Sequence, residues 1–361
     1  MKIKSLIILL FFTVFCKAQQ FTLETALNST VNETSGLLYL NNTLITHNDS
    51  ANTNQLFEID TATGEVTRTV TITNATNVDW EDLTYDDTYI YIGDFGNNAG
   101  DRTDLKIYRI TIADYFASTS VTADVINYDY SNQTNFTPSP FATNFDAEGL
   151  IHYNNQLYIF SKNWLDGNTN IYVIPKTPGT YSTSIVDTIN AEGLISGATY
   201  NNLDNSIVLC GYDGDGAFLI QLSAFNSGLF SNGSILKSSL TVPTNYSVQI
   251  EGVTSISASE YYVTAENNTQ GLAGLYSFDF STLSVADFIK DLIAFYPNPA
   301  KDKIFINKAN CITKIYSITG KLVRTSINQI IDISDFTSGI YILTLKHSES
   351  LNSTVKKLVV Q

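Results

Sequence analysis

Short apolar strands alternate with turns rich in Asn, Asp and Gly throughout residues 21–289. One phrase recurs in this region: a small or acidic residue, then Gly or Asp, an apolar strand, a polar turn, and a second strand rich in Tyr, Ile and Val. Its copies occupy residues 33–49, 80–98, 147–163, 195–213 and 250–267. A third apolar strand follows each copy, and a fourth strand is visible after the first copy. Repeated units of short antiparallel strands at this spacing are typical of β-propeller blades.

The number of copies predicts an all-β protein with a five-bladed β-propeller, and six blades are the alternative. The long interval between the second and third copies contains residues 114–147, which we interpret as an outer-strand excursion because it is too short for another blade. The strand near residues 21–27 is expected to complete the last blade, since an open sheet edge invites aggregation. A sandwich or a solenoid would explain the regular hairpin units less well, and the sequence shows no helical periodicity.

The formal net charge of −15 is unevenly distributed, because residues 21–289 are strongly acidic whereas residues 290–361 are basic. This change of sign predicts a domain boundary near residue 290. We therefore assign the propeller to residues 19–289 and a second, smaller domain to residues 290–361. So acidic a chain is a poor partner for nucleic acid, whose phosphates must be neutralised by Lys and Arg.

Residues 1–18 have the organisation of a cleaved signal peptide. Two lysines open the chain, the apolar run at residues 5–16 is too short to span a bilayer, and Lys17 and Ala18 follow it. A lipoprotein signal with Cys16 as the lipidated residue is the alternative, but Phe15 before it is bulky. No later apolar run reaches transmembrane length. The sequence thus predicts export to the periplasm and beyond.

The last 70 or so residues contain four motifs in order: FYPNPAKDKIFIN at 295–307, KIYSITGKLVRT at 314–325, IDISDFTSGIYILTL at 331–345, and a basic KKLVVQ end. Their short alternating strands and Gly, Asn and Asp turns predict a small antiparallel, Ig-like β-sandwich. The segment resembles the type A sorting domain of the type IX secretion system of Bacteroidetes. That resemblance implies a secreted or surface-attached protein whose partner, through this domain, is the type IX secretion machinery.

The first strand of a propeller blade lines the central channel, and a hairpin brings the end of the second strand back to the same rim. Polar groups occupy both positions in every copy. Carboxylates brought together in this way repel one another unless a cation, a proton or a basic side chain neutralises them. Calcium, which takes six to eight oxygen ligands, is the expected cofactor. The predicted metal ligands are Glu81, Asp82, Asp94, Glu148 and Glu251, and the predicted ligand-binding residues are Asp49, Asn97, Lys162 and Trp164.

Two other roles for the rim remain open. The Glu and Ser residues that begin the inner strands can instead hydrogen-bond the backbone of the next blade, which would make them structural. Catalysis is the other alternative, with Glu81 as the candidate base and His47 as the candidate proton-transfer group. The signatures G-x-S-x-G, H-E-x-x-H and G-x-x-x-x-G-K-[ST] do not occur in the chain.

Residues 33–37, 79–83 and 91–98 resemble secreted propellers related to the esterase-like phytase and SdiA-regulated groups. That resemblance implies a calcium-associated propeller that could be a phosphoesterase. However, Lys162 is the only basic residue at the predicted rim, and a highly charged inositol phosphate would need more.

The sequence therefore predicts an exported or surface-displayed β-propeller that binds a small-molecule or glycan ligand beside a divalent cation. The first alternative is a calcium-dependent phosphoesterase or esterase-like hydrolase. The second is a structural or adhesive surface protein.

Overall fold

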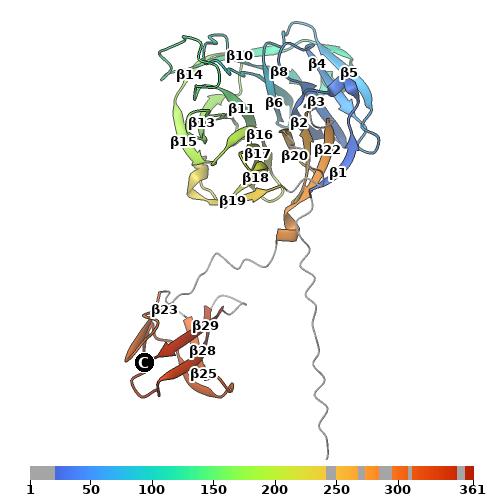
Figure 1. Cartoon of the computed structure of the whole chain (residues 1–361). Coiled ribbons are helices and arrows are strands. Elements are labelled where there is room, and N and C mark those ends of the chain that lie inside the picture. The colour runs from blue at the N-terminus through green and yellow to red at the C-terminus, as the bar shows by residue number, and fades with distance from the viewer. Residues whose placement is uncertain (1–20, 241–248, 267–272, 284–294, 308–310, 348–353) are drawn as a thin grey trace, which may run out of the picture. The chain divides into compact units, whose positions relative to one another are not determined.

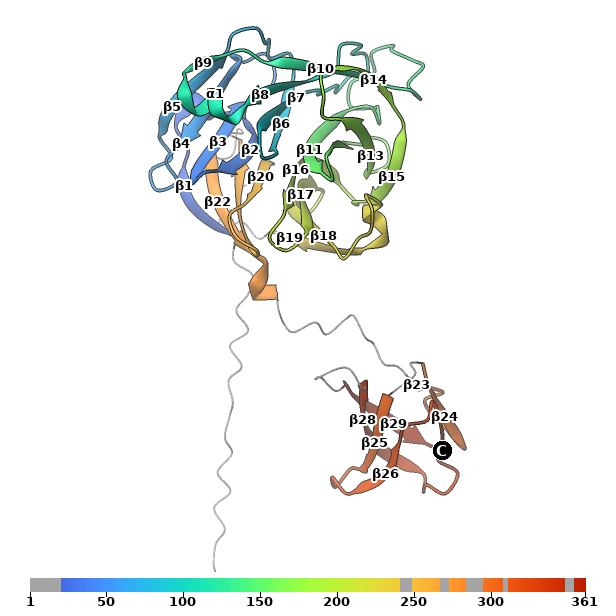
Figure 2. The ribbon, with the colours of Figure 1, turned by 180° about the vertical axis from the view of Figure 1, so that it is seen from behind.

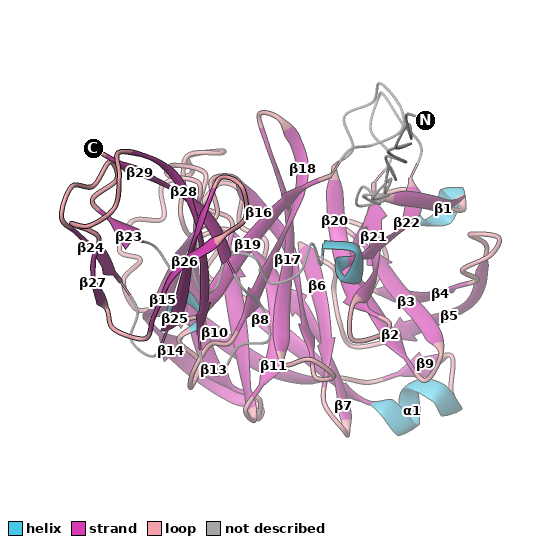
Figure 3. Ribbon diagram, turned by 90° about the horizontal axis from the view of Figure 1, so that it is seen from below, coloured by secondary structure: helices cyan, strands magenta, loops and turns pink. Residues whose placement is uncertain are grey.

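The computed structural model describes residues 21–240, 249–266, 273–283, 295–307, 311–347 and 354–361. It divides the chain into two units, Met1–Leu283 and Ser284–Gln361, which are considered separately below. Strands make up most of the described residues (Figure 3), as expected for an all-β protein.

Five sheets of four or five strands form the first unit. The innermost strand of each sheet lies near the centre of a ring (Figures 1 and 2). In blades 1 to 5 these inner strands are β2 (Thr34–Leu40), β6 (Trp80–Tyr85), β11 (Ala147–Tyr153), β16 (Leu194–Asn201) and β20 (Ile250–Ser255). Each inner strand contacts the next one, and β20 contacts β2, so the ring is closed. The described residues thus form a five-bladed β-propeller, which confirms the predicted fold.

The other strands follow outward in every blade. The second strands are β3 (Thr43–Asn48), β7 (Tyr89–Asp94), β12 (Gln156–Ser161), β17 (Ser206–Asp213) and β21 (Glu260–Ala265). The third strands are β4 (Gln55–Ile59), β8 (Lys106–Thr111), β13 (Asn168–Pro175), β18 (Gly216–Ser223) and β22 (Gly274–Asp279). The fourth strands are β5 (Val66–Ile72), β10 (Asp124–Tyr130), β15 (Ile185–Asn190), β19 (Ser234–Ser239) and, for blade 5, β1 (Thr22–Ala26). Because β1 pairs antiparallel with β22, the first described strand closes the last blade, as predicted.

Two further strands connect neighbouring blades at their outer edges. β9 (Ser120–Val121) follows β8 of blade 2 in the chain but pairs in parallel with β5 of blade 1. In the same way, β14 (Gly179–Thr183) follows β13 of blade 3 and pairs in parallel with β10 of blade 2. The exchanged strand β9 lies between the second and third copies of the phrase and contributes to the length of that interval.

A short helix, α1 (Ile112–Ala117), precedes β9, and the sequence analysis missed it. The hydroxyl of Thr111 caps it by accepting a hydrogen bond from the backbone N–H of Asp114 at 3.0 Å. Six residues are too few to show a helical period. The described 3₁₀ turns are η1 (Ser29–Val31), η2 (Phe230–Asn232) and η3 (Phe280–Leu283).

Five apolar clusters fill the interfaces between neighbouring blades. They follow from the period of two along a strand. In β12, Leu157 and Ile159 pack toward blade 2, whereas Tyr158 and Phe160 pack toward blade 4. Because both faces of such a strand are buried, its sequence is a continuous apolar run rather than an alternating one.

The second unit contains two sheets with a shared apolar core, as expected for a β-sandwich. One sheet contains β23 (Phe295–Tyr296), β24 (Lys303–Ile306) and β27 (Ile330–Asp332). The other contains β25 (Cys311–Ser317), β26 (Leu322–Ser326), β28 (Gly339–His347) and β29 (Thr354–Val360). Ile304 and Ile331 from the first sheet and Ile315, Leu343 and Leu358 from the second are buried in this core. Among the described residues of the whole chain, no helix is long and apolar enough to cross a membrane.

Candidate cation site at one mouth of the channel

Every inner strand begins with a β-bulge at the phrase that recurs in the sequence. In blade 2, for example, the pairing register shifts between Trp80 and Asp82. A bulge leaves one residue unpaired and redirects its side chain. The residues within these five bulges include Ser35, Glu81, Glu148, Ser196 and Glu251. The repeated phrase is therefore a repeated backbone irregularity that places polar side chains at one end of the inner strands.

The residue after the bulge sets how closely the inner strands approach each other. A Cβ atom at Gly197 would lie 2.4 Å from the carbonyl oxygen of Glu251 in the next blade. One at Gly252 would lie 2.4 Å from the carbonyl oxygen of Ser35. Glycine permits this approach because it has no side chain. Blade 2 differs, since it has Asp82 at this position.

The Asp82 side chain links three blades. Its Oδ1 accepts the backbone N–H of Leu83 at 2.8 Å, and its Oδ2 accepts those of Leu150 in blade 3 and Ala198 in blade 4 at 2.7 and 3.0 Å. The residue is fully buried. Asp82 was predicted as a metal ligand, but the structure gives both of its oxygens to backbone amides.

The two serines in the bulges also bond to the next blade. Ser35 Oγ donates to the carbonyl oxygen of Glu81 at 2.7 Å, and Ser196 Oγ donates to that of Ile250 at 2.5 Å. The two serines and Asp82 therefore form hydrogen bonds to the backbone of neighbouring blades, which is the structural role given above as an alternative to metal binding. The three glutamates are different.

Glu148 and Glu251 lie beside one lysine. Lys162 Nζ donates to Glu148 Oε1 at 2.7 Å, and both side chains are buried. Glu251 Oε1 accepts from Gln249 Nε2 at 2.6 Å, whereas its buried Oε2 has no hydrogen-bond partner among the described residues. Burial alone would lower the pKa of Lys162, but Glu148 and Glu251 raise it well above its usual range. Burial raises the pKa of Glu251 to about 7.

Glu81 belongs to a cluster of three carboxylates with Asp49 and Asp79. One oxygen from each lies within 4.8 Å of the other two. Gly96 borders this cluster: a Cβ atom there would lie 2.0 Å from Glu81 Oε1 and 2.4 Å from Asp79 Oδ2. The missing side chain at Gly96 thus leaves room for the carboxylates.

Burial and mutual repulsion raise the pKa values in this cluster. Burial, followed by the charges of Asp49 and Asp146, raises the pKa of Asp79 to about 7. Burial, followed by the charge of Glu148, raises the pKa of Glu81 well above its usual range. Such acids favour a bound proton or another cation.

Asp94 and Asn97 hold the loop that follows β7. Asp94 Oδ1 accepts from Arg102 at 3.0 Å and from the backbone N–H of Asp79 at 3.1 Å. Asn97 donates its backbone N–H to Asp146 Oδ1 at 2.6 Å. These contacts fix the loop that contains Gly96, so both residues support the cluster from outside it.

Asp146 and Trp164 form a second contact at the rim. Trp164 donates its ring N–H to Asp146 Oδ2 at 2.8 Å, and Lys162 Nζ lies 5.1 Å from the centroid of the Trp164 ring. Trp164 is half-buried. The indole therefore covers the lysine that neutralises Glu148.

His47 lies inside the fold rather than on the rim. It is fully buried, its ring packs edge-on against Trp80 at 5.6 Å between centroids, and its Nδ1 lies 3.0 Å from the carbonyl oxygen of Asn48. Burial lowers its pKa to about 4. A neutral, enclosed imidazole is poorly placed to exchange protons with a ligand at the mouth.

The sequence analysis missed Asp79 and Asp146, although a signal for them exists. Each of them precedes the first residue of an inner strand, β6 or β11, by one position. Asp79 and Asp146 stand two residues before Glu81 and Glu148, and Gln249 stands two before Glu251. The recurring Asp-x-Glu or Gln-x-Glu pattern was therefore visible in three copies.

Residues 294–361 match the family of secretion system C-terminal sorting domains. This match confirms the expectation from the C-terminal motifs. A domain of this kind indicates a secreted or cell-surface protein that engages its secretion machinery. The propeller fold and the C-terminal sorting domain together define the chain as an exported β-propeller protein.

The chain is also similar to solved structures at low sequence identity. PorZ, a surface component of the type IX secretion system of Porphyromonas gingivalis, is 15% identical, with 91% of this chain and 45% of that chain covered and a TM-score of 0.36. An exo-β-1,3-galactanase from Phanerochaete chrysosporium is 8% identical, with 94% and 99% covered and a TM-score of 0.42. A quinoprotein alcohol dehydrogenase-like protein from Bacteroides thetaiotaomicron is 11% identical, with 85% and 68% covered and a TM-score of 0.34. The chain spans about half the length of PorZ. No curated protein matches the chain.

Proposed function

We propose that the exported propeller is a ligand-binding module that holds a divalent cation, calcium, between Asp49, Asp79 and Glu81. The observation that carries this proposal is the convergence of these three carboxylates at one mouth of the channel. None of them forms an ion pair with a Lys or Arg among the described residues. Carboxylate oxygens are the ligands that calcium prefers. The buried Oε2 of Glu251, which has no hydrogen-bond partner among the described residues, also supports a cation at this mouth.

The basic side chains nearby favour a binding module over a phosphoesterase. Arg102 pairs with Asp94 and Asp104, and Lys162 pairs with Glu148. A phosphate ligand would have to displace these partners, because recognition of phosphate requires available Arg or Lys donors. A neutral ligand that contacts the cation through its oxygens has no such requirement.

Calorimetric titration of calcium into the chelator-treated full chain tests the proposal, with thermal unfolding followed in parallel. Binding should raise the free energy of unfolding by about 2.7 kcal/mol when free calcium is a hundredfold above the dissociation constant. Glu81→Gln should abolish the heat and the shift in Tm. Gly96→Ala should do the same, because its new methyl group would overlap the oxygens of Glu81 and Asp79.

Glu260→Gln is the matched control, since it removes an exposed carboxylate from β21. It should bind calcium like the unmodified protein. Absence of heat in the unmodified protein, or equal binding by Glu81→Gln, would contradict the proposal. Calcium-dependent turnover of p-nitrophenyl phosphate or p-nitrophenyl acetate, lost in Glu81→Gln, would establish the hydrolase alternative instead.

A further inference from the structure

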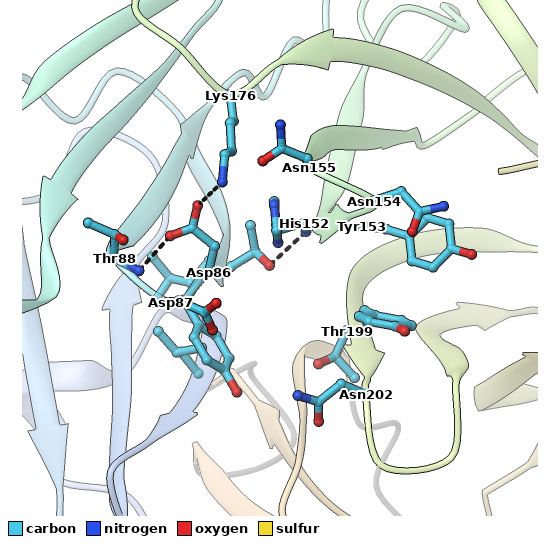
Figure 4. Close-up of a pocket in the computed structure, with 15 residues that line it drawn as sticks. Asp86, Asp87, Thr88, His152, Tyr153, Asn154, Asn155, Lys176, Thr199 and Asn202 are labelled. Carbon is cyan, nitrogen blue, oxygen red and sulfur yellow. Dashed lines mark hydrogen bonds and ion pairs between the residues drawn. The ribbon is translucent and has the colours of Figure 1, made fainter. Parts of the chain in front are cut away.

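A cavity of about 400 Å³ lies at the other end of the inner strands from the carboxylate cluster. Glu81 stands near the start of β6 and Tyr85 at its end, so the two sites are separated by roughly 13 Å of extended chain. Leu38 and Leu83 contribute apolar surface to the cavity. The hairpin turns of blades 2, 3 and 4 provide its polar lining (Figure 4).

The charges of this second mouth are almost fully neutralised. Asp86 Oδ2 accepts from Lys176 Nζ at 2.6 Å and from the hydroxyl of Tyr91 at 2.8 Å. Asp86 Oδ1 accepts two backbone N–H groups, both at 2.8 Å. The ammonium group of Lys176 is therefore already paired with Asp86. Among the residues that line the cavity, Lys176 is the only Lys or Arg. An anionic ligand would find no available cation here.

His152 and Asp87 also line the cavity, and Asp87 is exposed. Burial lowers the pKa of His152, so its ring is neutral at pH 7. Its buried Nε2 has no hydrogen-bond partner among the described residues. Figure 4 shows the imidazole beside Asp86 and Asn155. The cavity is thus lined by polar side chains without a net positive charge.

Aromatic and amide side chains complete the lining. The rings of Tyr153 and Tyr200 pack edge-on at 5.0 Å between centroids. Tyr85 also lines the cavity, and its side chain remains 37% exposed. Asn154 and Asn155 adopt positive φ values of 47° and 62°, as a two-residue hairpin turn requires, and their amides lie at the rim.

We propose that this second mouth binds a neutral saccharide of one or two rings, with Tyr85 as its stacking surface. The apolar C–H face of a pyranose suits an exposed aromatic ring, while its hydroxyls both donate and accept hydrogen bonds. The threonines and asparagines of the lining match those hydroxyls. The volume lies within the range of small-molecule sites. This proposal does not depend on the calcium site, which lies at the opposite mouth.

Saturation-transfer NMR of the full chain tests the proposal with a panel of neutral sugars: glucose, galactose, mannose, N-acetylglucosamine and their common disaccharides. At least one should bind, and binding should persist in the presence of EDTA. Tyr85→Ala should weaken it roughly tenfold, the upper range of an aromatic contact. Phe116→Ala is the matched control, because Phe116 is a ring of 38% exposure on α1. It should bind the sugar unchanged.

Further probes separate the saccharide from other ligands. Tetramethylammonium tests for a cationic ligand, and inorganic phosphate tests for an anionic one. Asp87→Asn should leave sugar binding intact, since a neutral ligand does not need that charge. The proposal is overturned if no sugar in the panel binds at millimolar concentration, if Tyr85→Ala and Asn202→Ala both bind as well as the unmodified protein, or if only tetramethylammonium binds and Asp87→Asn abolishes that binding.

Discussion

Replacing Asp82 by Ala removes the side chain that holds three blades together at the channel axis. The carboxylate accepts the backbone N–H groups of Leu83, Leu150 and Ala198, all buried. Each donor left without a partner costs about 1–3 kcal/mol. The sum is roughly 3–9 kcal/mol, and a water that enters the vacated space would keep the loss near the lower end.

A loss of this size is a large fraction of the 5–15 kcal/mol that typically stabilises a domain. It corresponds to a fall in Tm of at least about 6–12 °C for a unit of this size. Asp82→Asn should lose less, about 1–3 kcal/mol, because one amide oxygen can still accept two of the three N–H groups while its NH₂ faces the third.

Urea denaturation followed by tryptophan fluorescence is the appropriate assay. The chain has two tryptophans, Trp80 and Trp164, and both lie in the propeller unit, so the signal excludes unfolding of the C-terminal unit. Asp87→Ala is the control, because it removes an exposed carboxylate from the turn that follows Asp82's own strand. It should change the free energy of unfolding by no more than about 0.5 kcal/mol.

A loss below about 1 kcal/mol in Asp82→Ala would refute this reasoning about the hydrogen bonds. A second result would support the sequence-based prediction that Asp82 is a metal ligand. In that case Asp82→Asn would leave the stability of the calcium-free protein unchanged and would abolish calcium binding. The two measurements together therefore separate a structural carboxylate from a ligand.

Two other predictions concern ring closure and acid sensitivity. Gly64→Ala should lose about 2 kcal/mol or more, because Gly64 has a φ of +74° and its Cβ would lie 1.9 Å from the carbonyl oxygen of Ala26 in β1. Gly214→Ala should leave the Tm unchanged, because nothing lies within 4 Å of the new methyl group. An equal fall in the Tm of both variants would contradict this prediction. Burial alone would raise the pKa of Asp86, but Lys176 and three further donors outweigh it and lower the folded pKa to about 2, so Asp86 should stabilise the fold above its ordinary pKa of 3.8. The difference in free energy of unfolding between the unmodified protein and Asp86→Asn, measured by urea denaturation, should therefore be on the order of 1 kcal/mol at pH 5 and should shrink toward pH 2. A difference independent of pH would contradict this assignment.

The ring of blades was predictable because its signal is periodic. Continuous apolar strands such as residues 157–160 are buried on both faces, and the phrase that starts each blade recurs often enough to be counted. The closing strand followed from the need to cover an open edge. In contrast, α1 and the exchanged strands β9 and β14 depend on tertiary contacts. Their sequences are too short to show a pattern that would predict these elements.

The candidate site was predictable only in part, because side-chain direction at a bulge depends on register. Glu81 and Asp82 are neighbours, yet Glu81 joins the cluster at the mouth whereas Asp82 bonds to amides of the inner strands. Composition and spacing do not distinguish the two residues. The recurring Asp-x-Glu pattern does point to Asp79 beside Glu81, so the larger part of the cluster was accessible to sequence reasoning.

The buried glutamate at the mouth implies a conflict between stability and binding. Burial raises the pKa of Glu81 above its unfolded value, so its contribution to stability is present below the unfolded pKa and is lost as pH rises through the folded pKa. Glutamine has the same shape and no charge to desolvate. Without calcium, Glu81→Gln should therefore be at least as stable as the unmodified protein at pH 8, although it no longer gains stability from calcium. A carboxylate that weakens the metal-free fold and strengthens the metal-bound one is expected at a binding site, whereas a structural residue would stabilise both.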